Sequence, residues 1–568
     1  MNSRRRLIAA AGCVLLLVLL LVPMARVLVR SSMTEIDQKQ AAIARALEME
    51  KERAALLPYV PVQGVPDIEA IWAIEDARTE TDAELVDSMR CSTGEMGYDA
   101  ESRTFYATLG IENGDEWPEI ALSARGAEEV QVVWIDDYSY DWCAEAIREG
   151  YRYELLAYTQ SQYAYIGVVF TGLPVVTLHA EGEIVMGSDV PGRATVAAAG
   201  YEPIDTAMVV HQRGGGYTKV VPKWSYRLEF HSIGFDGKDE KLDTSVLGME
   251  ADSDWLLLAN AQDNTTVRNK LAWDIWNDWH VDGGIMQMQS EMVELFINNE
   301  YVGIYQLMQR VQEEKEIGRA GGDIRTDSVV RIISDCNPSQ KPTMVLKDIG
   351  INYILEYRYE PRGDDKKLFE LAQDYVMLSH KEPERQIDDE EFRRIVLERV
   401  DIQSMIDYIL FFHACTLRDN IGNNIYIFIM EQEDGRMKYY HAPWDMDTAF
   451  WVRPDGEDHN STYWPNLTMA LPTRMLDLNI DNCRELLWKT WREKRNTILS
   501  NESINNRMMN MEEYINASGA YLRESEKWYG EARKLNLSEM AYYSEMNQNT
   551  VGLVMEDMWP IEQDMLFQ

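Results

Sequence analysis

Two polar segments flank a predicted β-hairpin in the C-terminal half of the chain, and they constrain its fold more than any other feature. Asp419 and Asn424 lie in the first segment, and Asp445 and Asp447 lie in the second. Between them, two apolar runs joined by Glu-Asp-Gly-Arg are typical of two strands and a turn, over residues 425–440. On this pattern alone, a pair of acidic loops beside a hairpin is an equally good interpretation.

An acidic residue, an amide five positions later and a second acidic pair are the groups that Mg²⁺-dependent phosphoryl transfer requires. Asp419 is the candidate base that orients and deprotonates an attacking hydroxyl. Asn424 and Asp445 are candidate ligands for Mg²⁺ or Mn²⁺, because amide and carboxylate oxygens suit these ions. Asp447 is a further ligand, or an anchor behind the ligands. Protein kinases place the same groups in the same order.

Several other segments share one property: they match motifs of a known family in the same order along the chain. They are Arg213-Gly214, Pro222 to Phe230, Leu257 to Lys270, Val293 to Tyr305 and Pro443 to Asp447. Together they resemble the CotH (spore coat protein H) kinase family of atypical, secreted or spore-associated protein-kinase-like proteins. The resemblance covers roughly Leu173 to the C-terminus.

The resemblance implies an α+β, atypical protein-kinase-like fold with two lobes, a β-rich N-lobe and a helical C-lobe. It also implies transfer of the γ-phosphoryl group of ATP to Ser or Thr of an envelope or spore-coat protein. Lys223 is the expected partner of the nucleotide phosphates. Arg213, Arg227 and Arg268 are further expected contacts of the nucleotide.

The chain departs from the family pattern at two places. Gly215 and Gly216 replace a polar pair after Arg213-Gly214, and Gln309 stands where the family usually has a Glu. Glu313 or Glu314 could compensate for the charge lost at Gln309. These departures favour an alternative, a non-catalytic, pseudokinase-like surface or envelope protein of binding or structural role. A carbohydrate-active enzyme with two carboxylates is a third hypothesis.

The charge of the chain excludes some partners. The 568 residues include 55 Lys and Arg against 95 Asp and Glu, a net charge of −40 that is spread along the chain. Such a surface repels nucleic acid, which is therefore not an expected partner. It also repels ATP, so a nucleotide site here must be built around cations.

The first 30 residues predict a transmembrane anchor. Three arginines, residues 4–6, precede a long apolar run, which orients the N-terminus to the cytoplasm and the rest of the chain outside it. A cleaved signal segment is the alternative, leading to a secreted or spore-coat protein. Residues 31–59, rich in Ala, Glu, Lys and Gln, predict a helical stalk.

Two domains are expected after the stalk. Residues 60–172 alternate β-rich pieces with acidic turns and predict a small β-rich domain, where Cys91 and Cys143 could form a disulfide. Residues 173–568 form the kinase-like domain. Its second half carries apolar residues at helical spacing, and helices are expected up to about Trp528.

Overall fold

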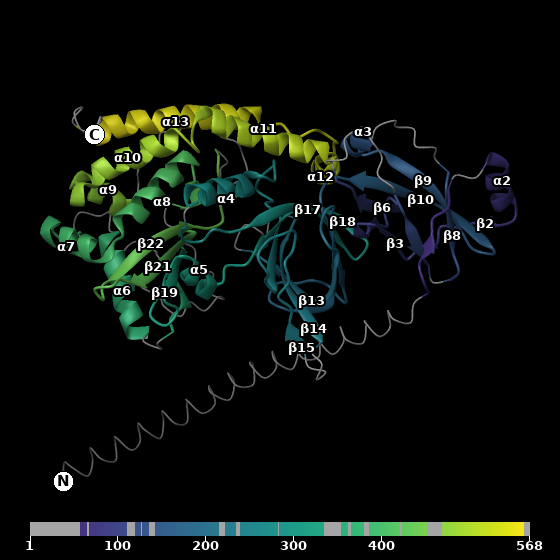
Figure 1. The fold of residues 1–568 in the computed structure, drawn as a ribbon, viewed down its shortest axis with the longest axis horizontal. Coiled ribbons are helices and arrows are strands. Elements are labelled where there is room, and N and C mark those ends of the chain that lie inside the picture. The colour runs from purple at the N-terminus through teal and green to yellow at the C-terminus, as the bar shows by residue number, and fades with distance from the viewer. Residues whose placement is uncertain are drawn as a thin grey trace, which may run out of the picture.

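The computed structural model describes residues 57–64, 67–110, 120–126, 128–135, 143–214, 222–233, 239–281, 283–333, 354–361, 365–379, 386–420, 423–450 and 469–561. The predicted anchor and nearly all of the predicted stalk lie outside these residues. Within them, no helix combines the length and the apolar character that crossing a membrane requires. The described chain is a mixed α+β structure whose C-terminal region is helical (Figure 1).

Two sheets occupy the N-terminal part of the described chain. One has the order β1 (Val60–Pro61), β7 (Ser123–Arg125), β3 (Ser88–Cys91) and β4 (Gly94–Glu95). The other has the order β5 (Gly97–Asp99), β6 (Thr104–Thr108), β10 (Gln162–Thr171), β9 (Arg152–Tyr158) and β8 (Gln131–Trp134), with β2 (Thr79–Glu80) also on β10. Helices α2 (Ile68–Asp76) and α3 (Cys143–Arg148) accompany them. Cys91 and Cys143 are free thiols, so the suggested disulfide is not formed.

The middle of the chain forms a closed β-barrel. Its strands follow the order β13 (Ile204–Arg213), β12 (Val190–Ala197), β11 (Val175–Ala180), β17 (Ser290–Ile297), β18 (Glu300–Gln309), β16 (Asp254–Leu258) and β14 (Ser225–Ile233). Pairing of β13 with β14 closes the barrel, and β15 (Asp239–Lys241) extends it from β14. Alternate apolar residues of these strands fill its interior, among them Leu228, Trp255 and Tyr305.

Two hairpins and one helix organise this region. Gln212 pairs with Tyr226 in the first hairpin, between β13 and β14. The turn between β17 and β18 contains Asn298 and Asn299, whose φ angles of 48° and 66° suit a tight hairpin turn. Helix α4 (Arg268–Trp279) follows β16 and packs its tryptophans against the barrel and the helical region.

The C-terminal region combines a four-stranded sheet with helices. The sheet has the order β20 (Ile354–Tyr359), β19 (Ser328–Ile333), β21 (Ile425–Glu431) and β22 (Met437–Pro443). The helices are α5 (Glu313–Arg319), α6 (Asp365–Leu378), α7 (Asp389–Arg399), α8 (Ile402–Ala414), α9 (Ala470–Asp477), α10 (Cys483–Arg495), α11 (Asn501–Ala517), α12 (Ala520–Tyr529) and α13 (Ser538–Met558). The predicted hairpin over residues 425–440 is β21 and β22.

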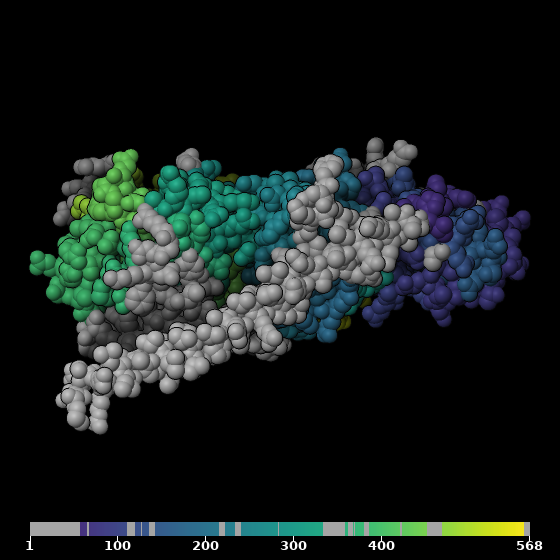
Figure 2. Space-filling view, turned by 90° about the horizontal axis from the view of Figure 1, so that it is seen from below, coloured from purple at the N-terminus to yellow at the C-terminus, as the bar shows by residue number. Residues whose placement is uncertain are grey.

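The three regions follow one another along the long axis of the molecule, as the space-filling view shows from purple through blue to green (Figure 2). Helix α12 joins all three, because Arg523 forms an ion pair with Glu294 of β17 and donates to Thr171 Oγ1 of β10. These contacts of α12 tie the barrel to the N-terminal sheets on one side and to the helical region on the other.

Candidate functional site

The first site segment, residues 415–420, is held by helices on both sides. Helix α8 ends at Ala414, and its last carbonyls accept hydrogen bonds from α13. Asn547 Nδ2 donates to His413 O over 2.7 Å, and Gln548 Nε2 donates to Ala414 O over 2.9 Å. These amides satisfy carbonyl groups that a helix end leaves unpaired. The segment that carries Asp419 thus starts from a fixed point.

Asp419, Asn424 and Arg331 form a chain of hydrogen bonds. Asn424 Nδ2 donates to Asp419 Oδ2 over 2.9 Å, and Arg331 Nη2 donates to Asn424 Oδ1 over 2.7 Å. Asn423 adds a bond of 3.2 Å to the same Asp419 oxygen. Arg331 belongs to β19, which pairs with β21 directly beside Asn424. The carboxylate of Asp419 is therefore oriented by amides and, through Asn424, by a guanidinium.

Asn420 joins the two site segments. Its buried Nδ2 donates to Trp444 O over 2.8 Å and to Asn424 O over 3.2 Å. Trp444 N donates to the same Asn424 oxygen over 2.9 Å. From the barrel side, Asn269 Oδ1 of α4 accepts from Met446 N over 3.0 Å. The backbone that carries Asp445 and Asp447 is thus fixed from both regions.

Asp445, Asp447 and Asp419 influence one another through their charges. Burial raises the pKa of Asp447 well above its usual range, and the negative charges of Asp445, Asp419 and Asp263 raise it further. The carboxylates are therefore close enough to repel one another. Asn424 and Asp445 have φ angles of 55° and 56°, in the left-handed region, which Asn and Asp adopt more readily than other non-glycine residues.

The donor set at this site suits a hard divalent cation. A cation would relieve the repulsion that raises the pKa of Asp447, and carboxylate and amide oxygens are its usual ligands. Asn424 Oδ1 already accepts a hydrogen bond from Arg331, so this oxygen would have to serve both Arg331 and a bound cation. In the part of the chain that the structure describes, no three His, Cys, Asp or Glu side chains converge closely enough to form a complete metal site.

Arginines face these carboxylates from the barrel and from the C-terminal sheet. Burial lowers the pKa of Arg213 at the end of β13, while the charge of Asp445 raises it and the charges of Arg331 and Arg310 lower it. Arg331 lies over the ring of Tyr426, with its Cζ 5.8 Å from the ring centroid, and its buried Nε has no hydrogen-bond partner among the described residues. The site thus pairs an acidic side with a cationic one.

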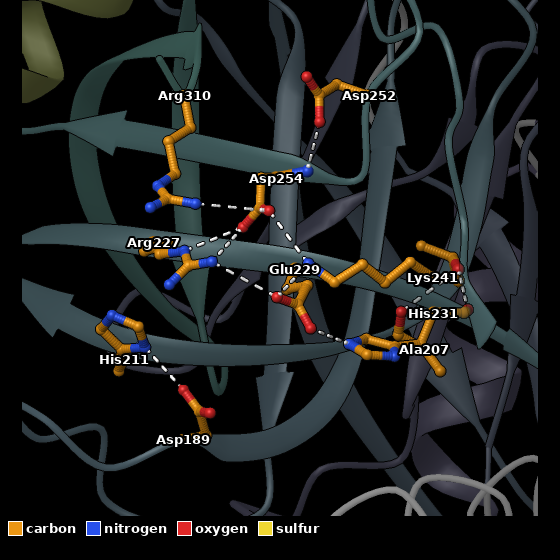
Figure 3. Close-up of polar contacts among 11 residues, drawn as sticks. Asp189, Ala207, His211, Arg227, Glu229, His231, Lys241, Asp252, Asp254 and Arg310 are labelled. Atoms are coloured by element: carbon orange, nitrogen blue, oxygen red, sulfur yellow. Dashed lines mark hydrogen bonds and ion pairs between the residues drawn. The ribbon is translucent and has the colours of Figure 1, made fainter. Parts of the chain in front are cut away.

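Arg227 lies on the outer face of the barrel in a polar network (Figure 3). Its neighbours Tyr226 and Leu228 face the barrel interior, so alternation places Arg227 outside. Its Nε donates to Asp254 Oδ1 over 2.9 Å, and Arg310 Nη1 approaches Asp254 Oδ2 at 3.7 Å. Asp254 therefore holds Arg227 firmly and Arg310 loosely, and nucleotide contact by Arg227 stays a prediction.

Lys223 is enclosed in a buried ion pair. Its Nζ donates to Glu524 Oε1 of α12 over 2.6 Å and to Ile304 O over 2.8 Å, and it lies 4.9 Å from the centroid of the Tyr305 ring. The side chain is 4% exposed. These contacts hold α12 against the barrel. The predicted role of Lys223 as phosphate partner would require this pair to open, and it stays a prediction.

Arg268 is also buried. Its Nε donates to Asp263 Oδ1 over 3.0 Å, and its Nη1 donates to Ala449 O and Phe450 O. Asp263 Oδ2 also accepts from Arg268 N over 2.8 Å, which satisfies one of the free N–H groups at the start of α4. Arg268 thereby positions the backbone that follows Asp447, and direct nucleotide contact by Arg268 stays a prediction.

Gln309 is buried and bonds to a backbone carbonyl. Its Nε2 donates to Glu250 O over 2.8 Å, whereas the next residue, Arg310, lies on the side of Asp254. Glu313, the suggested compensating residue, accepts from Arg358 Nε over 2.6 Å. Gly215 and Gly216 lie outside the described residues.

Sequence reasoning missed the residues that make the site cationic and rigid: Arg310, Arg331, Arg358 and Asn420. Arg358 lies over the same Tyr426 ring as Arg331, at 5.7 Å. Arg331 and Arg358 come from strands that pair only in the folded sheet, so spacing along the chain carried no signal for them. Asn420, next to Asp419, was the one position whose place in the motif could have drawn attention.

A β-barrel and a helical region that meet at amide-oriented carboxylates, with arginines nearby, define an α+β protein. The chain belongs to the CotH kinase family: the family model described as CotH kinase protein matches residues 210–550, more than half of the chain. That match includes Arg213, Asp419, Asn424, Asp445 and Asp447. No curated protein matches the chain.

Proposed function

We propose that this protein is an atypical protein kinase that transfers the γ-phosphoryl group of ATP to Ser or Thr of an envelope or spore-coat protein. One observation carries the proposal: Asn424 orients Asp419 over 2.9 Å, while Asp445 and Asp447 share its electrostatic environment. A fold alone does not require this combination of one oriented and two repelling carboxylates. The family membership supports it.

Asp419 acts on the acceptor. Its oriented carboxylate takes the proton of the Ser or Thr hydroxyl, whose oxygen forms a bond to the γ-phosphorus. The bond between that phosphorus and the β,γ-bridging oxygen breaks, and ADP leaves with the electron pair. Asn424 and Asn423 keep the Asp419 carboxylate aimed while this happens, because both amides donate to the same oxygen.

In this proposal the arginines bind the phosphate oxygens of ATP, and the carboxylates bind the accompanying metal ion. Arg213, Arg310 and Arg331 supply donors for phosphate oxygens, which the net charge of −40 would otherwise repel. Asp445 and Asp447, with Asn424, would hold Mg²⁺ or Mn²⁺. Such an ion, when bound, neutralises the charge on the phosphates. Metal-dependent nucleotide binding is the direct consequence.

In this proposal the barrel and the helical region correspond to the N-lobe and C-lobe of a kinase. Residues 173–568 are the kinase-like domain, and residues 60–172 are a separate small domain ahead of it. Residues 1–30 anchor the protein in the cell membrane with the catalytic domain outside the cytoplasm. The motif order and the family match over residues 210–550 support the kinase-like domain, and the composition of the N-terminus supports the anchor.

A non-catalytic role on the same scaffold is the second candidate. It is favoured by Lys223, whose ammonium group is committed to Glu524, and by Asn424, whose oxygen is committed to Arg331. A protein of this kind would bind a partner without transferring phosphate. The barrel would then serve as a binding scaffold.

A transfer assay separates the two candidates. The purified protein is incubated with ATP, Mg²⁺ and a library of Ser- and Thr-containing peptides, and mass spectrometry detects phosphorylated products. We expect phosphopeptides with wild-type protein and none with Asp419→Asn. Equal product with both proteins would contradict the role of Asp419, and Mg-ATP binding without product from any peptide would favour the non-catalytic candidate.

A further inference from the structure

A second site, separate from the carboxylates, lies where the start of α4 meets α12 and the connection from α12 to α13. It is a cavity of about 200 Å³ whose walls include Arg268, Phe450, Tyr521, Arg533, Lys534 and Glu539. Aromatic rings supply part of the wall, and charged groups supply the rest. Side chains of this mixture bind ligands that combine a charge with a short apolar stem.

The lining of the cavity is net positive, whereas the chain as a whole is strongly negative. Its lining contains three cations, Arg268, Arg533 and Lys534, and one carboxylate, Glu539, whereas the chain has 55 basic and 95 acidic residues. Arg268 is paired with Asp263, and Lys534 Nζ contacts Glu149 Oε1 at 3.0 Å. Among the described residues, no carboxylate lies within ion-pair distance of Arg533. The uncompensated positive charge is therefore that of Arg533.

Arg533 is exposed to solvent, and both its backbone and its guanidinium contact neighbouring residues. Its backbone N donates to Ser525 Oγ over 2.9 Å, and its Cζ lies 4.9 Å from the centroid of the Tyr529 ring. The hydroxyl of Tyr521, in the same wall of the cavity, donates to Asn264 O and holds that ring in place. A guanidinium that is fixed before binding loses less conformational entropy when it meets a carboxylate.

The cavity is coupled to the catalytic segment through few residues. Arg268, in its wall, donates to the carbonyl groups of Ala449 and Phe450, just beyond Asp447. Asp263 pairs with Arg268 Nε over 3.0 Å and fixes the guanidinium there. A group bound in the cavity therefore lies beside the segment that carries the catalytic carboxylates.

We propose that this cavity binds an acidic side chain of the acceptor protein, so that the kinase selects Ser or Thr residues in acidic sequences. The proposal rests on the proposed function, because it concerns the acceptor of that reaction. The strongly acidic chain repels an acidic peptide elsewhere, so recognition depends on the local reversal of charge at Arg533. Arg533 forms the ion pair, and the aromatic wall packs against the stem of the bound side chain.

The test measures peptide binding without ATP, so that it does not depend on catalysis. Fluorescence anisotropy compares a Ser peptide flanked by Glu with the same peptide flanked by Gln, at constant ionic strength. We expect wild type to bind the Glu peptide about tenfold more tightly, as one charge-assisted pair allows. Arg533→Gln should lose this preference. Lys527→Gln should keep it, because Lys527 is an exposed cation on α12 that pairs with Glu300 outside the cavity.

Equal affinity of wild type for the two peptides overturns the proposal, as does a preference that survives in Arg533→Gln. Free glutamate is the probe for a small-anion site. If it stabilises wild type but not Arg533→Gln against heat while the peptides are not distinguished, the site serves a free anion and the acceptor assignment is wrong. If wild type prefers the Glu peptide but does not bind Mg-ATP, the cavity is a peptide site and the proposed kinase function is wrong.

Discussion

The amide of Asn424 donates to the carboxylate of Asp419 over 2.9 Å, and this contact ties a candidate metal ligand to the candidate base. The same amide accepts from Arg331 through its oxygen. The side chain of Asn424 therefore contacts both a cationic and an acidic residue of the site. Changes at either end of this chain of contacts should have separable effects on binding and transfer.

Asp419→Asn should remove phosphoryl transfer and leave Mg-ATP affinity within about twofold of wild type. A base acts on the acceptor hydroxyl and not on the phosphates, and its loss typically costs about 10²- to 10⁴-fold in rate. Quench-flow rates and calorimetric titration give the two quantities. Asp434→Asn, at the tip of the β21–β22 hairpin, is the matched control and should change neither. Loss of nucleotide binding in a folded Asp419→Asn protein would refute this division of roles.

Asp445→Asn should behave in the opposite way and abolish metal-dependent ATP binding. The substitution removes one of the carboxylates that repel Asp447, so it weakens the attraction for a divalent cation. Calorimetric titration with Mg-ATP measures the effect, and circular dichroism checks that the fold persists. Unchanged affinity in the folded variant would show that Asp445 is not a ligand.

Lys223→Met should destabilise the protein without a specific effect on nucleotide. It leaves the Glu524 carboxylate buried and unpaired, which costs about 3–5 kcal/mol. The double variant Lys223→Met/Glu524→Gln should recover much of that loss, since the Gln oxygen can still accept from Ile304 N. Urea unfolding measures the recovery. We expect the double variant to bind Mg-ATP like wild type, and a large loss of affinity would instead support Lys223 as the phosphate partner.

Glu316 should make stability depend on pH near neutrality. Burial raises its pKa from 4.5 to about 7, against the attraction of Arg319. Between these values the folded protein binds a proton that the unfolded chain has lost, so stability falls as pH rises through this window, by about 3 kcal/mol. Unfolding by urea at several pH values should show a flatter profile for Glu316→Gln than for wild type. Glu313→Gln, on the same helix, is the control, and parallel profiles for wild type and Glu316→Gln would contradict the assignment.

Local sequence patterns predicted much of the fold. The hairpin over residues 425–440, strands β13 and β14, helix α4 and helices α6 to α8 all follow from alternation or helical spacing over a few residues. Closure of the barrel was not predictable, because it depends on pairing between strands distant in sequence, such as β11 with β17. Helix α13 was missed because polar residues, among them Asn547 and Gln548, interrupt its buried face.

The candidate site was predicted as a set of residue types but not as an arrangement. Asp419 and Asn424 are close in sequence and meet as the motif suggests. The ion pair of Lys223 could not be predicted, because its partner Glu524 is 301 positions away and no residue near Lys223 indicates that partner. The arginines that face Asp445 converge from separate strands, and only the folded sheets bring them together.

The measurement that tests the central claim most directly is calorimetric titration of the purified protein with ATP, once with Mg²⁺ and once with EDTA. Carboxylates on a chain of net charge −40 repel a polyanion, so binding should require the cation. We predict saturable binding with Mg²⁺ and a loss of at least about tenfold in affinity with EDTA. Equal affinity in the two titrations, or no binding with Mg²⁺, would contradict a metal-dependent kinase site at Asp419, Asp445 and Asp447.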